Sequence, residues 1–532
     1  MNKNTTLLPL LFLCLAYFGA IADNSVVANS LSPIALDLKA SMPQMQFANI
    51  AYSLIAVSIM LTVGFLGARF GWKKVLLSGF LIVTIGEFIT YISQDIYTFT
   101  YIGRIAVGIG ASMAVTAAFA LIPIIYTGNK TAAAFSAIAA SAAVASFVAP
   151  AASGIIIMDF GWRISFLILT IMFAASFIGA ALTIKIDEQI NNSLKFDFIG
   201  FIALFIGASG LIYGISQITN WVVLKAVHAP FLVFGLSPTL FVIFVSLLIL
   251  AFYGAYQSKR EEKYGMDSVF ISKEFFKDIG IKASIVLNGF KDYVTGAIMF
   301  IVVLYLQVVM GASALQSGLA LGIFSIGMVI TASFTMKFTS FSPKTLSIFG
   351  IALSSIAPLI IMLGIEEHSL NAGFFIGMFM LGFGLGIISA LASYVATITV
   401  KDISIASKSS GAQGAARNFG QAIGVAILGL VLLVTLESSV KNKINASNIP
   451  QTLKSEVNAM PNIAFVSDKE LQKELNEKNV DAITNKTIID INTQARLYAI
   501  RTTMLLLAIS SIIFIFFIFS LPSKSIKDMR KY

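Results

Sequence analysis

Residues 100–122 read TYIGRIAVGIGASMAVTAAFALI. The stretch can cross a bilayer as one helix, because about 20 apolar residues span the hydrocarbon core. Arg104 is its one charged residue, and it is matched by Asp23 near the end of the first apolar stretch of the chain. Ionisable side chains are costly in hydrocarbon unless they face a cavity or a partner, so they mark where a membrane protein works. The pair is the first indication of function.

The composition of the whole chain agrees with a membrane protein. Its 532 residues are 57% hydrophobic and 12% charged, with a mean hydropathy of +0.88, which excludes a soluble globular domain. We expect an all-α polytopic membrane protein with about 14 transmembrane helices. The apolar segments begin near Leu7, Gln46, Lys74, Phe99, Ala132, Arg163, Phe196, Pro230, Ile281, Ala314, Lys344, Leu370, Ile405 and Tyr498.

The basic residues predict the orientation. With the N-terminus in the cytoplasm, roughly 21 of the 36 Lys and Arg fall in cytoplasmic segments, as the positive-inside rule requires. An even number of helices then places both termini in the cytoplasm. We expect the chain to lie in the cell (inner) membrane. The net charge of +10 is dispersed over one membrane face, so it reflects topology and not nucleic-acid binding.

The N-terminus allows a second interpretation. Lys3, the apolar run Leu7 to Phe18 and the small residues up to Ala22 resemble a signal peptide with its cleavage site. We expect the helix to be retained, because the residues after Ala22 carry a motif that needs it. Cys14 is the single cysteine, so the chain has no intramolecular disulfide and no cysteine metal site.

Two hydrophilic regions interrupt the apolar pattern. Residues 258–280 carry mixed charges on the cytoplasmic side and are predicted to be a linker between two membrane halves. Residues 437–497 form an external region far longer than a typical connection. Its stretches Gln451 to Met460 and Asp468 to Lys478 have helix-forming composition, which predicts a small, partly helical external subdomain. A lid, a docking surface and a tolerated insertion all stay open.

Several motifs then point to one family. The loop after the second helix reads GFLGARFGWKK from Gly64 to Lys74, close to the signature G-x-L-x-D-R-x-G-R-K, although Ala68 and Trp72 replace an acidic and a basic residue. The fifth segment reads APAASG from Ala149 to Gly154. Together with the surroundings of Asp23, Arg104 and Arg417, these segments make the chain resemble the major facilitator superfamily, in its 14-helix drug/proton antiporter branch.

The resemblance implies a major facilitator fold. Two six-helix bundles would surround a cavity that opens alternately to either side. Residues 1–190 would form the first bundle, 191–257 an additional helix pair, and 281–532 the second bundle. Helices 1, 4, 9 and 12 would line the cavity, with Asp23 and Arg104 in its outer half.

The resemblance also implies roles for particular residues. We expect Asp23, Arg104 and Asp292 to serve proton coupling or substrate binding, because a carboxylate beside a cation can exchange a proton for a neighbouring charge. Lys291 and Asp292 are adjacent and point about 100° apart on a helix, so they should not face each other. Glu87 lies at a comparable depth on a helix that the family places at the periphery. Residues expected to act in gating or conformational change are Gly64, Gly67, Arg69, Gly71, Lys73, Pro150, Gly154 and Arg417.

These features give a functional hypothesis with alternatives. The chain is interpreted as a proton-coupled secondary transporter that exports lipophilic or cationic toxic compounds, consistent with its 44 phenylalanines. Transport of one specific metabolite, in either direction, and a sensor without transport are the alternatives. Two histidines without ligand spacing and no phosphate loop argue against an enzyme or an ATP-driven pump. We expect no cofactor or metal, a monomer in the lipid bilayer, and a periplasmic adaptor only if the organism has two membranes.

Overall fold

The computed structural model describes residues 7–40, 42–186, 195–221, 232–233, 235–338, 340–367, 369–399, 403–460, 463, 465–478, 480–518, 521 and 523–524. This part of the chain is almost entirely helical, with two isolated bridges, Val233 to Leu236 and Ile365 to Leu370. Fourteen of its helices are long and apolar enough to cross a membrane, as the sequence predicted.

The described residues of the first half form nine α-helices, and glycines separate two pairs of them. Gly71 and Gly161 have φ of +91° and +82°, a left-handed conformation that glycine adopts without strain, so the chain reverses between consecutive helices in a single residue. The helices are α1 (Leu8–Asp37), α2 (Met42–Phe70), α3 (Trp72–Ile92), the π-helix η1 (Thr98–Arg104), α4 (Ile105–Ile125), α5 (Asn129–Phe160), α6 (Trp162–Thr183), α7 (Phe198–Ser216), α8 (Ile218–Trp221) and α9 (Pro238–Tyr264).

The second half also consists mainly of long helices, and it includes a helical extension. A short connection leads from α9 into it. The elements are η2 (Met266–Ser268), η3 (Lys273–Phe276), α10 (Ile279–Leu304), the π-helix η4 (Tyr305–Val309), α11 (Ala314–Phe334), η5 (Thr335–Lys337), α12 (Pro343–Leu363), α13 (Ala372–Thr399), α14 (Ile403–Ala446), α15 (Gln451–Ala459), α16 (Asp468–Glu477) and α17 (Ala482–Ile518).

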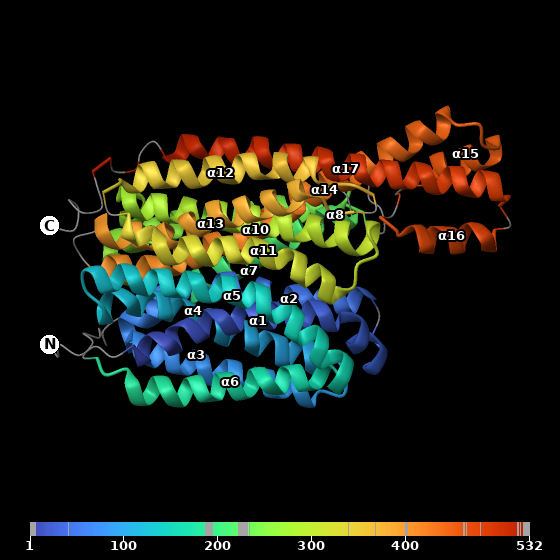
Figure 1. Ribbon diagram of the computed structural model, residues 1–532. Coiled ribbons are helices and arrows are strands. Elements are labelled where there is room, and N and C mark those ends of the chain that lie inside the picture. Colours follow the sequence, from blue (N-terminus) through green and yellow to red (C-terminus); the bar gives the residue numbers. More distant parts are fainter. Residues whose placement is uncertain are drawn as a thin grey trace.

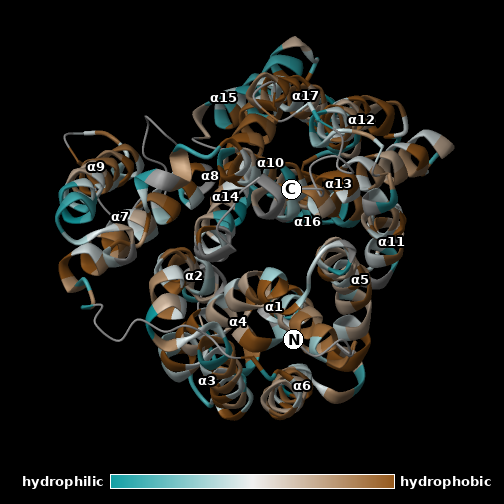
Figure 2. Cartoon of the chain, turned by 90° about the vertical axis from the view of Figure 1, so that its left-hand side faces the viewer, coloured by the Kyte–Doolittle hydropathy of each residue, from teal (hydrophilic) through white to brown (hydrophobic). Residues whose placement is uncertain are grey.

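The helices form two bundles that lie side by side. Figure 2 shows α1 to α6 on one side of the molecule and α10 to α14 with α17 on the other. The pair α7 and α9 packs beside α2 and α14, where the two bundles meet. The major facilitator fold with an additional pair is therefore confirmed, whereas the exact division of the chain stays a prediction because 187–194 lies outside the described residues.

An even number of spans puts the start of α1 and the end of α17 on one side, called here the terminal side. On the far side, α14 and α17 continue beyond the other helices and carry α15 and α16 (Figure 1). The two short helices match the predicted helical stretches. Arg496 of α17 holds this extension together, since its Nη2 lies 2.5 Å from Asp468 Oδ1 and its Nη1 donates to the carbonyl oxygen of Val466 at 2.8 Å.

The additional pair is fastened by one carboxylate. Asp197 caps α7 by accepting from the Gly200 amide at 3.0 Å, and it also accepts from Tyr256 at 2.9 Å and from Gln257 at 2.5 Å, both on α9. Ser209 of α7 donates to the carbonyl oxygen of Leu54 in α2 at 2.6 Å. The pair is thus tied both internally and to the first bundle.

A surface ion pair joins three helices at the far side. Arg163, at the start of α6, pairs with Asp37 at the end of α1 and donates to the carbonyl oxygen of Ser93 at 2.8 Å. Trp162 also donates to Asp37, at 3.1 Å. The hydrogen bond from Arg163 is the main reason that the pKa of Asp37 lies below its usual value.

This pair predicts a pH-dependent stability. A carboxyl group with a lowered pKa stabilises the folded state above its unfolded pKa of about 4, and this contribution is lost as the pH falls through the folded value. Asp37→Asn should therefore lower the apparent melting temperature at pH 7 but not in strong acid. The loss should be below about 1 kcal/mol, because both side chains are partly exposed. Thermal unfolding of the purified protein measures it, and an equal effect of the exposed control Asp159→Asn would contradict the assignment.

Candidate functional site

A buried ion pair joins α1 to the start of α4. Arg104 Nη1 and Nη2 donate to Asp23 Oδ1 and Oδ2 at 2.6 and 2.8 Å, and both side chains are 1% exposed. Such two-point contacts between a guanidinium and a carboxylate are the strong kind of charge-assisted hydrogen bond. Arg104 ends the π-helical turn η1, a distortion that often occurs at functional sites. The structure thus brings together the two residues that the sequence singled out first.

Glu87 of α3 belongs to the same group. It is fully buried, and it interacts electrostatically with Asp23 and Arg104. Neither of its carboxylate oxygens accepts a hydrogen bond from any described residue. The helix α3 exposes apolar residues such as Ile85 and Phe88 on one face, whereas Glu87 is buried where α3 packs on α4. Two carboxyl groups and one guanidinium therefore form a buried acidic cluster, Asp23, Glu87 and Arg104.

A central cavity of about 460 Å³ lies next to this cluster. Its lining comes from both bundles, including α1, α2 and α5 on one side and α10, α11 and α14 on the other. Two expectations need correction. Among the described lining residues none belongs to α13, the twelfth span, whose glycines pack against α11 and α12 instead. Asp23 and Arg104 were also expected in the cavity, but neither is among its described lining residues.

Tyr52 and Asn24 are the wall between cluster and cavity. Both line the cavity, and the Arg104 guanidinium lies 5.8 Å from the centre of the Tyr52 ring. Asn24 follows Asp23 in α1, so a movement of α1 changes both the cluster and the cavity surface. The sequence analysis did not predict which face of α1 lines the cavity. Residues 17, 21, 24 and 28 line it, and their spacing is that of one helix face.

Asp292 lines the cavity together with Lys291. Lys291 Nζ lies 2.7 Å from Asp292 Oδ1, so the expectation that adjacent residues cannot meet was wrong. The 100° between adjacent residues describes only the directions in which their side chains leave the helix. The long lysine side chain bends around the helix and reaches the carboxylate. The second carboxylate oxygen of Asp292 has no hydrogen-bond donor among the described residues.

Arg417 of α14 lines the cavity. Its guanidinium carbon is 4.5 Å from the centre of the Phe119 ring and 5.7 Å from that of Tyr17. Phe119 in turn contacts Phe135, and Phe135 contacts Tyr394 of α13. These rings join α4, α5 and α13 toward the terminal side, so Arg417 forms the floor of the cavity.

The end of α2, Gly71 and the start of α3 hold most of the other predicted conformational residues. A Cβ atom on Gly67 would lie 2.5 Å from the Trp72 ring, so the glycine lets that tryptophan close over the end of α2. Lys73 donates to the carbonyl oxygen of Ala181 in α6 at 3.1 Å, and the guanidinium of Arg69 lies 5.1 Å from the Phe70 ring centre. Gly71 supplies the reversal described above, and Gly64 lies within α2. Their part in gating stays a prediction.

The fifth helix reaches the cavity at Pro150. Asn29 of α1 donates to the carbonyl oxygen of Pro150 at 2.9 Å and to Ser153 at 2.8 Å. A proline has no N–H to donate to the carbonyl oxygen four residues before it. The side chain of Asn29 instead adds a hydrogen bond between helices, to the carbonyl oxygen of Pro150 itself. Gly154 has open space where a Cβ would be, so its role is not close packing.

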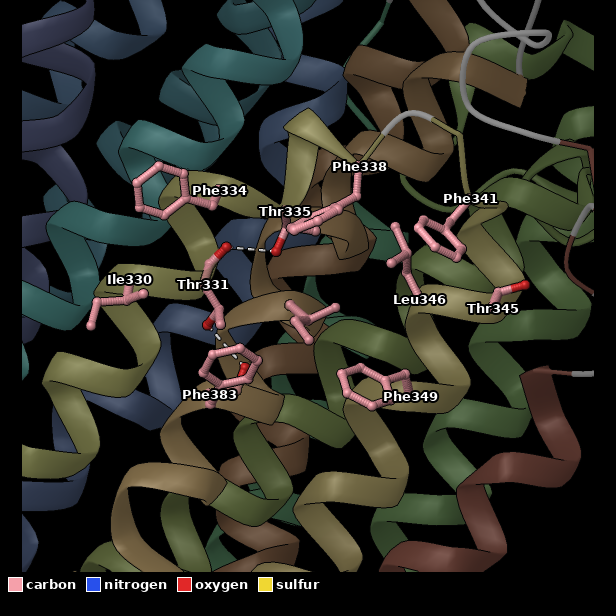
Figure 3. A pocket seen from close by; sticks show the side chains of 11 residues that line it. Ile330, Thr331, Phe334, Thr335, Phe338, Phe341, Thr345, Leu346, Phe349 and Phe383 are labelled. Carbon is pink, nitrogen blue, oxygen red and sulfur yellow. Dashed lines mark hydrogen bonds between the residues drawn. The ribbon is translucent and has the colours of Figure 1, made fainter. Parts of the chain in front are cut away.

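A second pocket, of about 540 Å³, lies between α11, α12 and α13 near the terminal side. Figure 3 shows its phenylalanine rings and the threonine hydroxyls of Thr331 and Thr335. These hydroxyls donate to the carbonyl oxygens of Phe383 and Thr331 at 2.9 and 2.6 Å. The described lining residues are uncharged, in contrast to those of the central cavity.

Comparison with known proteins agrees with this architecture. The family model for the Major Facilitator Superfamily matches residues 13–271. A riboflavin transporter of Clostridioides difficile is 26% identical over 65% of this chain and 73% of its own length. The tetracenomycin C resistance and export protein of Streptomyces glaucescens is 22% identical over 84% of this chain and 79% of its own. A crystal structure of a bacterial homologue of the human lysosomal transporter Spinster covers 98% of both chains with a TM-score of 0.53 at 12% identity.

Proposed function

We propose that this chain is a member of the major facilitator superfamily, whose family model matches residues 13–271, and that it is a proton-coupled secondary transporter that exports lipophilic aromatic compounds by alternating access. The observation that carries the proposal is the buried acidic cluster beside the cavity. Two carboxylates and one guanidinium leave one negative charge uncompensated in a site without water contact. Buried uncompensated charge is costly, and one proton shared by the two carboxyl groups removes it.

Proton binding would change how α1 is held. With the proton in place, Asp23 and Glu87 can share it while Arg104 keeps its partner. Without the proton, the second carboxylate must reach water or another cation, which favours an arrangement of the bundles that opens the site. Because Asn24 and Tyr17 of the same helix line the cavity, each protonation state would also present a different surface to the substrate. A ligand shifts such an equilibrium only by its differential affinity for the two states.

The orientation is part of the proposal. We place the terminal side in the cytoplasm, so that α15 and α16 project to the outside and the chain resides in the cell membrane. Protons entering from outside would reach the cluster in exchange for outgoing substrate. The chain would act as a monomer, and a periplasmic adaptor would be needed only in an organism with two membranes.

A second candidate function is transport of one aromatic metabolite. It is favoured by the relative described as a riboflavin transporter, whereas the tetracenomycin relative is described as a resistance and export protein. The two candidates share the mechanism and differ in the breadth of substrates.

A transport assay in inside-out membrane vesicles tests the proposal. Vesicles from cells that produce the chain should accumulate members of a panel of neutral and charged aromatic dyes when acidified inside, and a protonophore should abolish the accumulation. A single accepted compound would favour the metabolite transporter. If no compound moves in response to the pH gradient, proton-coupled export is contradicted.

Glu87→Gln is expected to uncouple transport without unfolding the protein. The variant keeps the Asp23 to Arg104 pair, whose charges already cancel, so the cluster has no need of a proton. Accumulation against a gradient should fall by about tenfold or more, while exchange of labelled substrate across the membrane continues. The exposed control Glu474→Gln should transport normally. Wild-type accumulation in Glu87→Gln would remove Glu87 from the mechanism.

A further inference from the structure

Arg417 carries an unused hydrogen-bond donor at the floor of the central cavity. The residue is 6% exposed, and its Nη1 donates to Asn288 Oδ1 at 3.2 Å. Its Nη2 has no acceptor among the described residues. A buried guanidinium with an unsatisfied donor is costly. Nη2 itself is shielded from solvent, but the Arg417 side chain lines the cavity, so a small rotation of the guanidinium would let a ligand there supply the missing acceptor.

The surroundings of Arg417 hold a cation without neutralising it. The ring faces of Phe119 and Tyr17 attract a positive charge. The rings carry no negative charge that would neutralise it. Lys291 lies within electrostatic reach of Arg417 and is itself paired with Asp292. The Asp23 carboxylate on the other side of the wall is held by Arg104.

The charges that line the cavity therefore favour an anion. Among the described lining residues the charged ones are Lys291, Arg417 and Asp292, which gives one positive charge in excess. The other polar lining groups are amides and hydroxyls, such as Asn24, Gln307 and Gln421. A cationic compound would add a third positive charge to a site with one carboxylate, whereas an anionic compound would complete the pairing.

We propose that the substrates of this cavity are aromatic compounds with an acidic group, whose anion binds Arg417 Nη2 at the floor. The inference rests on the proposed transport function and names its substrate class. A carboxylate or phenolate placed there forms a charge-assisted hydrogen bond, while the aromatic part lies against Phe324, Met328 and Met299, which line the same cavity. This reverses the cationic part of the hypothesis drawn from the sequence.

Equilibrium binding of two matched dyes tests the substrate class. Fluorescein is an anion and rhodamine 123 a cation, and both are built on the same xanthene ring system. Fluorescence anisotropy with the purified full-length protein gives both affinities without requiring transport. Wild-type protein should bind fluorescein at least about tenfold more tightly than rhodamine 123, the discrimination expected for one hydrogen bond to a charged group.

Two variants should shift the affinities in opposite directions. Arg417→Gln should weaken fluorescein binding by about tenfold or more, and Arg417→Lys should restore part of it. Asp292→Asn leaves Lys291 without its carboxylate, so it should strengthen fluorescein binding and weaken rhodamine 123 binding. Misfolding would weaken both dyes in every variant and cannot produce this pattern. Arg501→Gln, an exposed arginine on α17 whose Nη2 donates to the carbonyl oxygen of Ile365, is the matched control and should leave both affinities within about twofold.

Three results would overturn the proposal: tighter binding of rhodamine 123 by wild type, fluorescein affinity unchanged in Arg417→Gln, or no binding of either dye. Failure of proton coupling is a separate result, because it would appear in the vesicle assay while the binding pattern of the two dyes stays intact.

Discussion

Asp23→Asn is expected to abolish proton-driven accumulation of substrate in vesicles while the protein stays folded. In the wild type, the buried acidic cluster has one carboxylate more than it has cations. The substitution removes that excess, and Glu87 then becomes the single counter-ion of Arg104. The neutral cluster no longer needs a proton, so the pH gradient has no group through which to act.

The size of this effect depends on the position of Asp23. Glu87 lies on α3, but Asp23 lies on α1 directly before Asn24, a residue of the cavity wall. We therefore expect accumulation to fall to the level of vesicles without the protein, a larger loss than in Glu87→Gln. The exposed Asp490 of α17 provides a matched control, and Asp490→Asn should transport normally. An Asp23→Asn protein that accumulates substrate like the wild type would remove the carboxylate from the coupling mechanism.

Gly382→Ala is expected to have the largest effect on stability. An added Cβ would lie 1.9 Å from the carbonyl oxygen of Phe324 in α11, which is backbone and cannot turn away. The whole of α11 would have to shift from α13, and Phe324 is one of the residues that line the cavity. Overpacking of this kind costs about 3 kcal/mol or more, so the apparent melting temperature of the detergent-solubilised protein and its yield should both fall.

Gly254 of α9 provides the matched control for this variant. Nothing lies within 4 Å of the position that its Cβ would take. Gly254→Ala should therefore keep or slightly raise the melting temperature, because alanine favours a helix by about 1 kcal/mol over glycine. Equal melting temperatures for Gly382→Ala and Gly254→Ala would show that the contact between α11 and α13 is looser than described.

Much of the fold could be predicted because membrane insertion acts on local composition. Each span needs its own run of apolar residues, so the fourteen spans could be counted one by one from the sequence. The helices of the far-side extension were visible for a similar reason, since Gln451–Ala459 and Asp468–Glu477 have local helix-forming composition. The arrangement in two bundles came from the resemblance to a family and not from hydropathy.

The candidate site was predictable only in part, because its geometry depends on how helices rotate against one another. Asp23 and Arg104 could be paired as two opposite charges at matching depth. Glu87 could not be added to them, since hydropathy does not tell which face of α3 turns inward. The reach of Lys291 to Asp292 depends on a side-chain conformation, and the unused donor of Arg417 appears only when its neighbours on α1, α4 and α10 are in place.

The central claim is that the buried acidic cluster gives up a proton as the substrate binds. The most direct measurement is proton release when an aromatic dye that the vesicles accumulate, and that has no titratable group of its own, is added to the purified protein in a weakly buffered solution containing a pH indicator, with Asp23→Asn as the comparison. We expect release of about one proton per bound substrate by the wild type and none by the variant. Equal release by both proteins, or none by a wild type that binds the dye, would contradict it.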